Sequence, residues 1–238
     1  LAAMAGVRNA IEQPDLYVNV NLNGTQNLLD AARAAGSVGN FVLASTSSVY
    51  GNTMQVPFVE TDPCDRPLQP YAAAKRAAEI LGYSYHHLFG QNFTVLRFFT
   101  VYGPNGRPDM MAYLLADSIY KGKKIPLYDG GEMYRDWTFV DDTVAGIVAA
   151  LDRPLGYEII NLGRGEPVLL RNFVRIMEEL SGRKANLAPM PRLAADFVRN
   201  EADISKARRL LGYNPQVSVA EGVRRFWEWY REHDSGKN

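Results

Sequence analysis

Tyr71 and Lys75 stand four residues apart in the stretch QPYAAAKRAAEILGYSYHH, residues 69–87. On a helix, residues at i and i+4 share one face, so both side chains can point into one site. A free phenol titrates near ~10, and a phenol that acts as a base near neutral pH needs a pKa about three units lower, roughly 4 kcal/mol. A lysine cation at ~4 Å and an effective dielectric of about 20 supplies an energy of that size. The spacing therefore suits an activated phenolate, but it is also typical of two polar residues on a solvated helix face.

Four hydroxyl side chains, Ser45 to Ser48, follow directly on the short apolar and β-branched segment 40–46. Such a segment is typical of a buried parallel strand. Open α/β sheets bind ligands at the carboxyl ends of their strands, so this cluster could orient a substrate hydroxyl. The alternative is that the hydroxyls only satisfy backbone groups where the strand turns into a loop.

The elements that would position these residues alternate between helix and strand. We expect helices over 15–35 and 71–88 and strands within 40–46 and 92–103. Asp15 is the predicted N-cap of the first helix and Gly36 its stop, and Pro70 opens the second helix. Later segments predict a helix at 140–153 with acidic residues in its first turn, a strand at 157–163 and an amphipathic closing helix at 218–233. The alternation indicates right-handed βαβ units on a parallel sheet.

The composition excludes several classes of partner. The chain has 238 residues, with 26 basic and 26 acidic side chains and a pI near 7.0. No basic cluster indicates nucleic acid or an anionic membrane, and no apolar run is long enough to cross a bilayer. The single cysteine, Cys64, excludes an internal disulfide, and the three histidines have no Cys or carboxylate neighbours that complete a metal site. We therefore expect a cytoplasmic protein, without a metal, that acts on small ligands.

Five segments, taken in their order along the chain, carry a resemblance to a known family: STSSVYG, YAAAK, LRFFTVYGPNGRPDM, YRDWTFVDDTV and NLG. The chain resembles the extended short-chain dehydrogenases/reductases of the NAD-dependent nucleotide-sugar epimerase/dehydratase family, over essentially its whole length. The resemblance implies an α/β fold with a Rossmann-like, doubly wound parallel sheet and a smaller C-terminal α/β substrate-binding region. The implied NAD-binding domain covers residues 1–103, and residues 104–238 are mainly the substrate-binding region, with 136–162 returning to the Rossmann domain.

The family's Gly-rich turn for the dinucleotide pyrophosphate does not occur in the sequence. The segment LAAMAGVR resembles the end of the family's fourth strand, so we expect a chain that lacks the first strands of the sheet. A hypothesis of another class follows from this. The polypeptide would keep helices that form a dimer, roughly residues 16–35 and 71–88, without holding NAD or acting as an enzyme.

The resemblance assigns residues to three roles by position. The catalytic residues would be Tyr71, Lys75 and Thr46. The NAD-binding residues would be Ala2, Ala3, Asn21, Ser45, Tyr71 and Lys75, although a buried structural amide is a serious alternative for Asn21. The substrate-binding residues would be Ser47, Thr100, Arg107, Tyr128 and Arg135, and for Tyr128 a role in core packing is equally expected.

The same positions narrow the expected reaction. The family's 4,6-dehydratases carry an Asp and a Glu after the catalytic Thr, where this chain has Ser47 and Ser48, which are not useful acids or bases near neutral pH. The segment GPNGRPDM is similar to one in the UDP-glucuronate 4-epimerases, and Arg107 and Thr100 would hold the sugar carboxylate. We expect a homodimeric NAD-dependent epimerase that converts UDP-glucuronate to UDP-galacturonate through a 4-keto sugar. A UDP-glucuronate decarboxylase or another nucleotide-sugar epimerase or dehydratase is the alternative.

Overall fold

A computed structural model describes residues 3–192 and 198–233 of the chain. The chain divides into two compact units. Unit 1 consists of Leu1–Phe99, Ala145–Leu162 and Ala202–Tyr213, and unit 2 of Thr100–Val144, Gly163–Glu201 and Asn214–Asn238. The first boundary differs by four residues from the expected one after residue 103. The return to unit 1 begins at 145 instead of 136, and a further segment at 202–213 returns as well.

Unit 1 is built on a parallel sheet of three strands in the order β1-β2-β7. The strands are β1 (Phe41–Thr46), β2 (Phe93–Phe98) and β7 (Tyr157–Leu162), and Ser45 lies opposite Arg97 in the register. Because all three strands run the same way, their carboxyl ends meet at one edge of the sheet. The expected α/β class with a parallel sheet is confirmed, and the hydroxyl cluster follows β1 at this edge.

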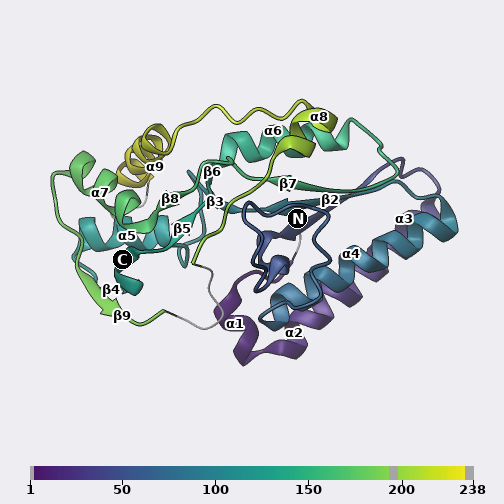
Figure 1. Cartoon of the computed structure of the whole chain (residues 1–238), viewed down its shortest axis with the longest axis horizontal. Helices are drawn as coiled ribbons and strands as arrows, with labels where there is room; N and C mark the ends of the chain where they lie inside the picture. The colour runs from purple at the N-terminus through teal and green to yellow at the C-terminus, as the bar shows by residue number, and fades with distance from the viewer. Residues whose placement is uncertain (1–2, 193–197, 234–238) are drawn as a thin grey trace. The chain divides into compact units, whose positions relative to one another are not determined.

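The helix α4 (Pro70–Phe89) covers one face of this sheet, and α8 (Ser205–Leu211) packs against β7 on the other side (Figure 1). The predicted helix is confirmed: Pro70 occupies the first turn, and the Gln69 side chain accepts a hydrogen bond from the Ala72 amide. At Gly82 an added Cβ would come within 2.1 Å of the Phe93 ring. The glycine therefore allows α4 to lie close to the sheet.

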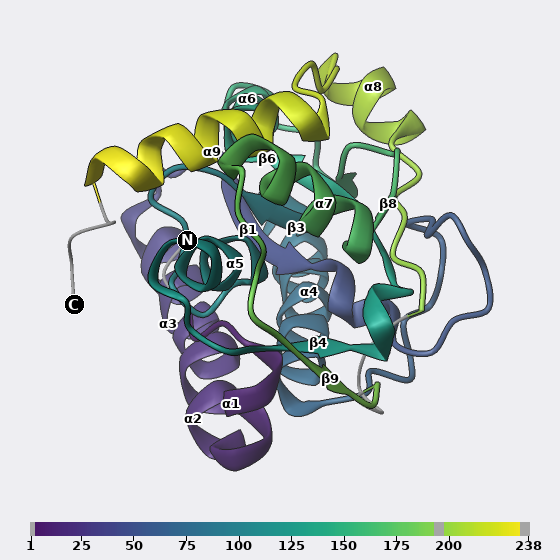
Figure 2. The ribbon, with the colours of Figure 1, turned by 90° about the vertical axis from the view of Figure 1, so that its left-hand side faces the viewer.

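The predicted helix over 15–35 is present but is divided into three parts. These are α2 (Pro14–Val18), a π-helical turn η1 (Asn19–Asn23) and α3 (Gly24–Ala35), and they follow a short helix α1 (Val7–Glu12). The prediction of Asp15 as N-cap is wrong, because Pro14 occupies the first turn and Gln13 precedes it. Gly36 ends α3 with a φ of 64°, as predicted. The helix α3 lies beside α4 (Figure 2).

Unit 2 contains three two-stranded pairings. They are β3 (Thr100–Tyr102) with β6 (Trp137–Phe139) and β4 (Ile125–Tyr128) with β9 (Leu187–Met190), both parallel, and β5 (Tyr134–Arg135) with β8 (Val168–Leu169), antiparallel. The strand expected within 92–103 is therefore interrupted at Phe99, so that β2 lies in unit 1 and β3 in unit 2. A 3-10 turn, η3 (Asp129–Gly131), follows β4.

Three helices complete the core of unit 2: α5 (Met111–Lys121), α7 (Leu170–Ser181) and α9 (Val219–His233). Figure 2 shows α7 and α9 beside each other, and both bury aromatic and aliphatic side chains in one core. Phe173 stacks on Trp137 with ring centroids 3.9 Å apart. The helix α6 (Val140–Leu151) was expected from its acidic first turn, and its residues 145–151 belong to unit 1.

Candidate active site

Lys75 is buried in unit 1, with 4% of its surface exposed. Its ammonium donates a 2.9 Å hydrogen bond to the carbonyl oxygen of Ala44 in β1. Burial lowers the pKa of Lys75 to about 8, and the negative charge of Glu79 opposes that shift. The prediction of a solvated face is therefore wrong for Lys75, which is a desolvated cation at the carboxyl end of a parallel strand.

Tyr71 lies one turn before Lys75 in α4 and is half-buried. The ring of Tyr17 in α2 packs edge-on against the Tyr71 ring, with centroids 6.0 Å apart and planes at 81°. The Tyr17 hydroxyl in turn donates to the carbonyl of Ala5 at 3.1 Å. The orientation of the Tyr71 ring is thus set from α2, while its i, i+4 spacing keeps it on the Lys75 side of α4.

Thr46 is the last residue of β1 and the N-cap of a 3-10 turn, η2 (Ser47–Tyr50). Its hydroxyl accepts a 3.1 Å hydrogen bond from the Ser48 amide. A hydroxyl has one donor and two acceptor positions, so this bond orients the Thr46 oxygen and leaves its proton for a substrate oxygen. Ser47 follows as a buried residue of η2. The second alternative therefore applies to Thr46, because its hydroxyl caps a turn. A role of this hydroxyl in orienting a substrate stays a prediction.

Ser45 takes part in a buried polar cluster that sequence reasoning missed. Its hydroxyl donates a 2.5 Å hydrogen bond to the carboxylate of Glu79, which also receives two hydrogen bonds from Arg97, at 3.1 and 2.8 Å. Glu79 and Arg97 are both 0% exposed. A signal for this cluster was present, because Glu79 continues the i, i+4 series of Tyr71 and Lys75 and Arg97 interrupts an apolar strand.

Asn21 and Ala3 were expected near the cofactor. Asn21 lies in η1, and its carboxamide makes a reciprocal pair with Met4: it accepts from the Met4 amide at 3.0 Å and donates to the Met4 carbonyl at 2.9 Å. The structure thus uses the Asn21 side chain to hold the Ala3–Ala5 segment against η1. Ala2 lies outside the described residues.

A pocket in unit 2 brings together two of the expected substrate residues. Thr100 and Arg107 both line one small pocket, together with Gly103, Met110, Tyr113 and other residues. Thr100 is fixed through its backbone amide, which donates to the Asp136 carbonyl at 3.0 Å. The pocket therefore brings together two residues whose side chains carry a hydroxyl and a guanidinium, groups that suit an anionic oxygen ligand.

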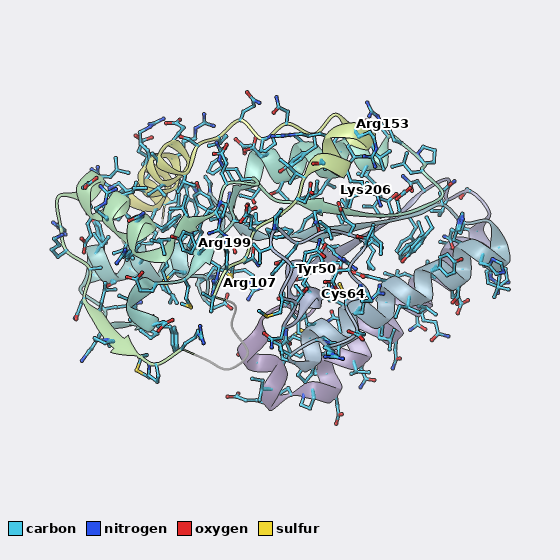
Figure 3. The ribbon with its side chains drawn as sticks, viewed as in Figure 1. Tyr50, Cys64, Arg107, Arg153, Arg199 and Lys206 are labelled. Atoms are coloured by element: carbon cyan, nitrogen blue, oxygen red, sulfur yellow. The ribbon has the colours of Figure 1, made fainter. Side chains whose placement is uncertain are left out.

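Arg107 (Figure 3) is exposed and pairs with Asp109 in its own turn. Its Nε and Nη2 donate to the two carboxylate oxygens of Asp109, at 3.0 and 2.5 Å. This is the two-pronged geometry in which a guanidinium recognises a carboxylate. A ligand carboxylate that takes these two donors must displace Asp109, or use the other side of the guanidinium.

Tyr128 and Arg135 also lie in unit 2. Tyr128, at the end of β4, packs against the aromatic core of the unit, so the structure supports the packing role for its ring. Arg135 in β5 donates to the carbonyl of Tyr134 at 2.8 Å and approaches the sulfur of Met133. Arg135 is half-buried, and the backbone of Tyr134 holds its Nη1.

The residues of unit 1 fit a nicotinamide dinucleotide at its ribose end. Among the residues that the structure describes, the Lys75 ammonium has one acceptor, the Ala44 carbonyl, although it carries three donors. A buried cation needs further acceptors, and ribose hydroxyls supply them.

No group of three His, Cys, Asp or Glu side chains in the described ranges could hold a metal ion. No described helix is long and apolar enough to cross a membrane.

Comparison with known proteins relates this arrangement to one family. Residues 1–163 match the NAD dependent epimerase/dehydratase family. The UDP-glucuronate 4-epimerase of Thermodesulfobacterium geofontis is 46% identical over 234 residues, which cover 98% of this chain and 72% of the relative.

Two solved structures are similar in fold and sequence. The UDP-glucuronic acid 4-epimerase of Bacillus cereus, in complex with UDP-glucuronic acid and NAD, aligns with a TM-score of 0.90 and 34% identity, over 98% of this chain and 74% of that one. MoeE5, in complex with UDP-glucuronic acid and NAD, aligns with a TM-score of 0.92 and 34% identity, over 98% and 78%. Both of these neighbours bind NAD and UDP-glucuronic acid.

Proposed function

Because this chain belongs to the NAD dependent epimerase/dehydratase family, we propose that it interconverts UDP-glucuronate and UDP-galacturonate at C4 of the sugar. The observation that carries the proposal is the desolvated Lys75 cation on the same side of α4 as Tyr71. The 46% identity to a UDP-glucuronate 4-epimerase supports the substrate. The absence of an acid or base at Ser47 and Ser48 supports epimerisation over dehydration.

The proton chemistry belongs to Tyr71. As a phenolate stabilised by the Lys75 cation, it takes the proton of the sugar 4-hydroxyl. Thr46 donates a hydrogen bond to the same oxygen, because the Ser48 amide takes only one of its two acceptor positions and leaves its proton available. NAD, when bound, supplies the acceptor and donor of the hydrogen at C4. Lys75 would also hold the bound dinucleotide, because its ammonium keeps donors beyond the one given to Ala44.

Inversion requires that the 4-keto sugar present its other face before C4 is reduced. The hydrogen removed from C4 then returns to C4 and Tyr71 returns the proton to the same oxygen, so that no net oxidation occurs. The only groups that this sequence of events needs from the chain are a base, an orienting hydroxyl and a cation. Tyr71, Thr46 and Lys75 supply all three from α4 and the end of β1.

A uronate makes one further demand on the site. A 4-keto hexuronate is a β-keto acid and can lose CO2 when the carboxylate carbon–carbon bond overlaps the ketone π system. We assign Arg107 and Thr100 to the carboxylate, because both line one pocket in unit 2. A carboxylate held by two guanidinium donors is kept out of that alignment.

The proposal includes a homodimer formed through α3 and α4. Large apolar side chains are exposed on both helices, Leu28 on α3 and Ile80, Tyr83, Leu88 and Phe89 on α4. Adjacent apolar helix faces of this kind are typical of a twofold interface between identical chains. The cytoplasm stays the expected location, and fractionation of cells that express the tagged full-length protein tests it.

The experiment is incubation of the full-length protein with UDP-glucuronate and NAD+, with the products resolved by proton NMR. The expected product is UDP-galacturonate, formed until the two epimers reach equilibrium, without release of CO2. A UDP-pentose would instead identify a decarboxylase and overturn the role of Arg107. An unchanged uronate, with NAD bound, would overturn the substrate.

A further inference from the structure

We propose that the buried Glu79–Arg97 ion pair is a positioning pair that anchors both ends of the segment Ser45–Tyr50 and so sets the location of the Thr46 hydroxyl. The reaction that Thr46 serves rests on the proposed function. The anchoring itself rests on contacts within unit 1 alone.

The first anchor lies at the start of the segment. The Ser45 hydroxyl donates to one carboxylate oxygen of Glu79 at 2.5 Å, and Arg97 Nε donates to the same oxygen at 3.1 Å. Arg97 Nη2 donates to the other oxygen at 2.8 Å. Ser45 and Arg97 are opposite each other in the pairing of β1 with β2, so Glu79 joins both strands to α4 one residue before Thr46.

The second anchor lies at the end of the segment. The Arg97 guanidinium lies over the ring of Tyr50, 4.7 Å from its centroid. Tyr50, labelled in Figure 3, is the last residue of η2. The Tyr50 hydroxyl donates to the Asn161 side chain in β7 at 2.7 Å. One ion pair thereby fixes both ends of the segment Ser45–Tyr50. Thr46 and Ser47, the residues expected to face the substrate, lie between the two anchors.

Burying the Glu79–Arg97 ion pair in this part of the core has a large desolvation cost. Removing two full charges from water costs several kcal/mol per ion, and apolar side chains of similar volume often give equal or greater stability. Apolar side chains do not fix the orientation of their neighbours. Each hydrogen bond of Glu79 and Arg97 does so, because it restricts an angle as well as a distance. Arg76 adds a fourth hydrogen bond to the Glu79 carboxylate at 3.0 Å, which further restricts its orientation.

The surroundings of Glu79 tie the pair to the catalytic helix as well. Glu79 follows Lys75 by one turn of α4, and its backbone carbonyl accepts from the Tyr157 hydroxyl of β7 at 2.9 Å. The charged and titratable side chains near the carboxylate are Lys75, Arg76, Arg97, Tyr50, Tyr157 and Cys64. Although burial opposes its charge, the hydrogen bonds and charge of Glu79 raise the pKa of Arg97, so Arg97 stays charged.

Two single substitutions release one anchor each and keep the ion pair. Ser45→Ala removes the hydroxyl that bonds Glu79, and Tyr50→Leu removes the ring under Arg97. The double variant Glu79→Gln/Arg97→Met removes the pair without leaving one buried charge alone. Glu158→Gln is the matched control, because Glu158 is also a unit 1 carboxylate in an ion pair, with Lys206 at 2.6 Å, but lies on β7 and is partly exposed.

Two measurements on the full-length protein test the proposal. Amide hydrogen exchange of residues 46–51, read against the amides of β7, should rise at least about tenfold in the two single variants and the double variant. The rate constant kcat for the UDP-uronate should fall about 10- to 100-fold while KM changes by less than about threefold, because a displaced Thr46 affects the reacting centre more than ground-state binding. Glu158→Gln should change neither quantity.

Unchanged amide exchange at residues 46–51 in both single variants would overturn the anchoring. If kcat falls by the same factor as KM rises in these variants, the ion pair has only a role in folding. If the double variant does not fold, the two single variants decide the question. If the unsubstituted protein does not epimerise a UDP-uronate, the proposed function fails, whereas the exchange data still decide the anchoring.

Discussion

The ammonium of Lys75 donates a 2.9 Å hydrogen bond to the carbonyl oxygen of Ala44, which joins α4 to the carboxyl end of β1. Two residues after Ala44, Thr46 caps η2 and keeps its hydroxyl proton for a ligand. The bond therefore fixes the cation relative to the Thr46 hydroxyl, which we propose to orient the substrate. The cost is desolvation of the ammonium, which lowers the pKa of Lys75 to about 8.

This lowered pKa predicts a pH dependence of stability that Lys75→Met removes. Lysine in the unfolded chain titrates at 10.5, so between about 8 and 10.5 the unfolded state holds a proton that the folded state has lost. The free energy of unfolding should therefore rise with pH in this window, by about 3 kcal/mol in total. Below about 8 both states are protonated, and the buried charge lowers stability by that amount.

Urea unfolding of the native protein and of Lys75→Met at intervals from pH 7 to 10.5 measures the difference. The variant should lack the rise, and near neutral pH it should be at least as stable as the native protein, because the lost hydrogen bond is worth only about 1 kcal/mol. Parallel curves for the two proteins would show that Lys75 titrates as an exposed lysine.

Tyr71→Phe should lower turnover of the UDP-uronate at least about 100-fold, because the substitution removes the only group assigned to proton transfer. Binding of NAD should persist, since Lys75 and its bond to Ala44 remain. Tyr85→Phe is the matched control on the same helix: its hydroxyl bonds Asp30 at 2.7 Å, away from the site. Comparable losses in the two variants would contradict the role of Tyr71.

Arg107→Gln should raise KM for the UDP-uronate about 10- to 100-fold, because a charge-assisted pair is lost, and should leave binding of UDP-glucose nearly unchanged. It should also increase the fraction of decarboxylated product. The control is Arg175→Gln, an exposed arginine of α7 that pairs with Glu179 at 2.7 Å. An equal loss of affinity for both sugars would place Arg107 on the nucleotide instead of the carboxylate.

The apolar faces of α3 and α4 predict the assembly state. Leu28→Glu combined with Ile80→Glu should convert the homodimer to a monomer, because both side chains are more than half exposed and a charge there cannot be desolvated cheaply. Light scattering after size-exclusion chromatography gives the mass. Met54→Glu, at a side chain that is 92% exposed in a loop, should leave the dimer intact. A native protein that is already monomeric would contradict the interface.

Local patterns predicted the elements around the site well. Pro70 opens α4 and Gly36 ends α3 because proline and glycine restrict or permit backbone angles without help from the rest of the fold. The strand at 92–103 was predicted as one element, and its interruption at Phe99 was missed. Its two halves pair with different strands, β2 with β1 and β7 and β3 with β6, and pairing partners cannot be read from one strand's own residues.

The sequence predicted which side chains form the site, and the structure adds the contacts that hold these side chains in place. The spacing of Tyr71 and Lys75 showed that the two could share a face, but burial of Lys75 depends on β1, which is remote in sequence. Glu79, Arg97 and Tyr50 come from a helix, a strand and a turn, so their contact is a property of the tertiary fold. For Asn21, the structure shows a structural contact where the sequence predicted a residue near the cofactor, because its carboxamide is hydrogen-bonded to the Met4 backbone.

The central claim is that C4 of a UDP-uronate is oxidised and re-reduced while the carboxylate is retained. UDP-glucuronate labelled with deuterium at C4, incubated with the full-length protein and NAD+ in ordinary water, tests it most directly. The account predicts UDP-galacturonate that keeps the deuterium at C4 and is absent with Tyr71→Phe. Loss of the label to solvent, or a labelled UDP-pentose in place of the epimer, would contradict it.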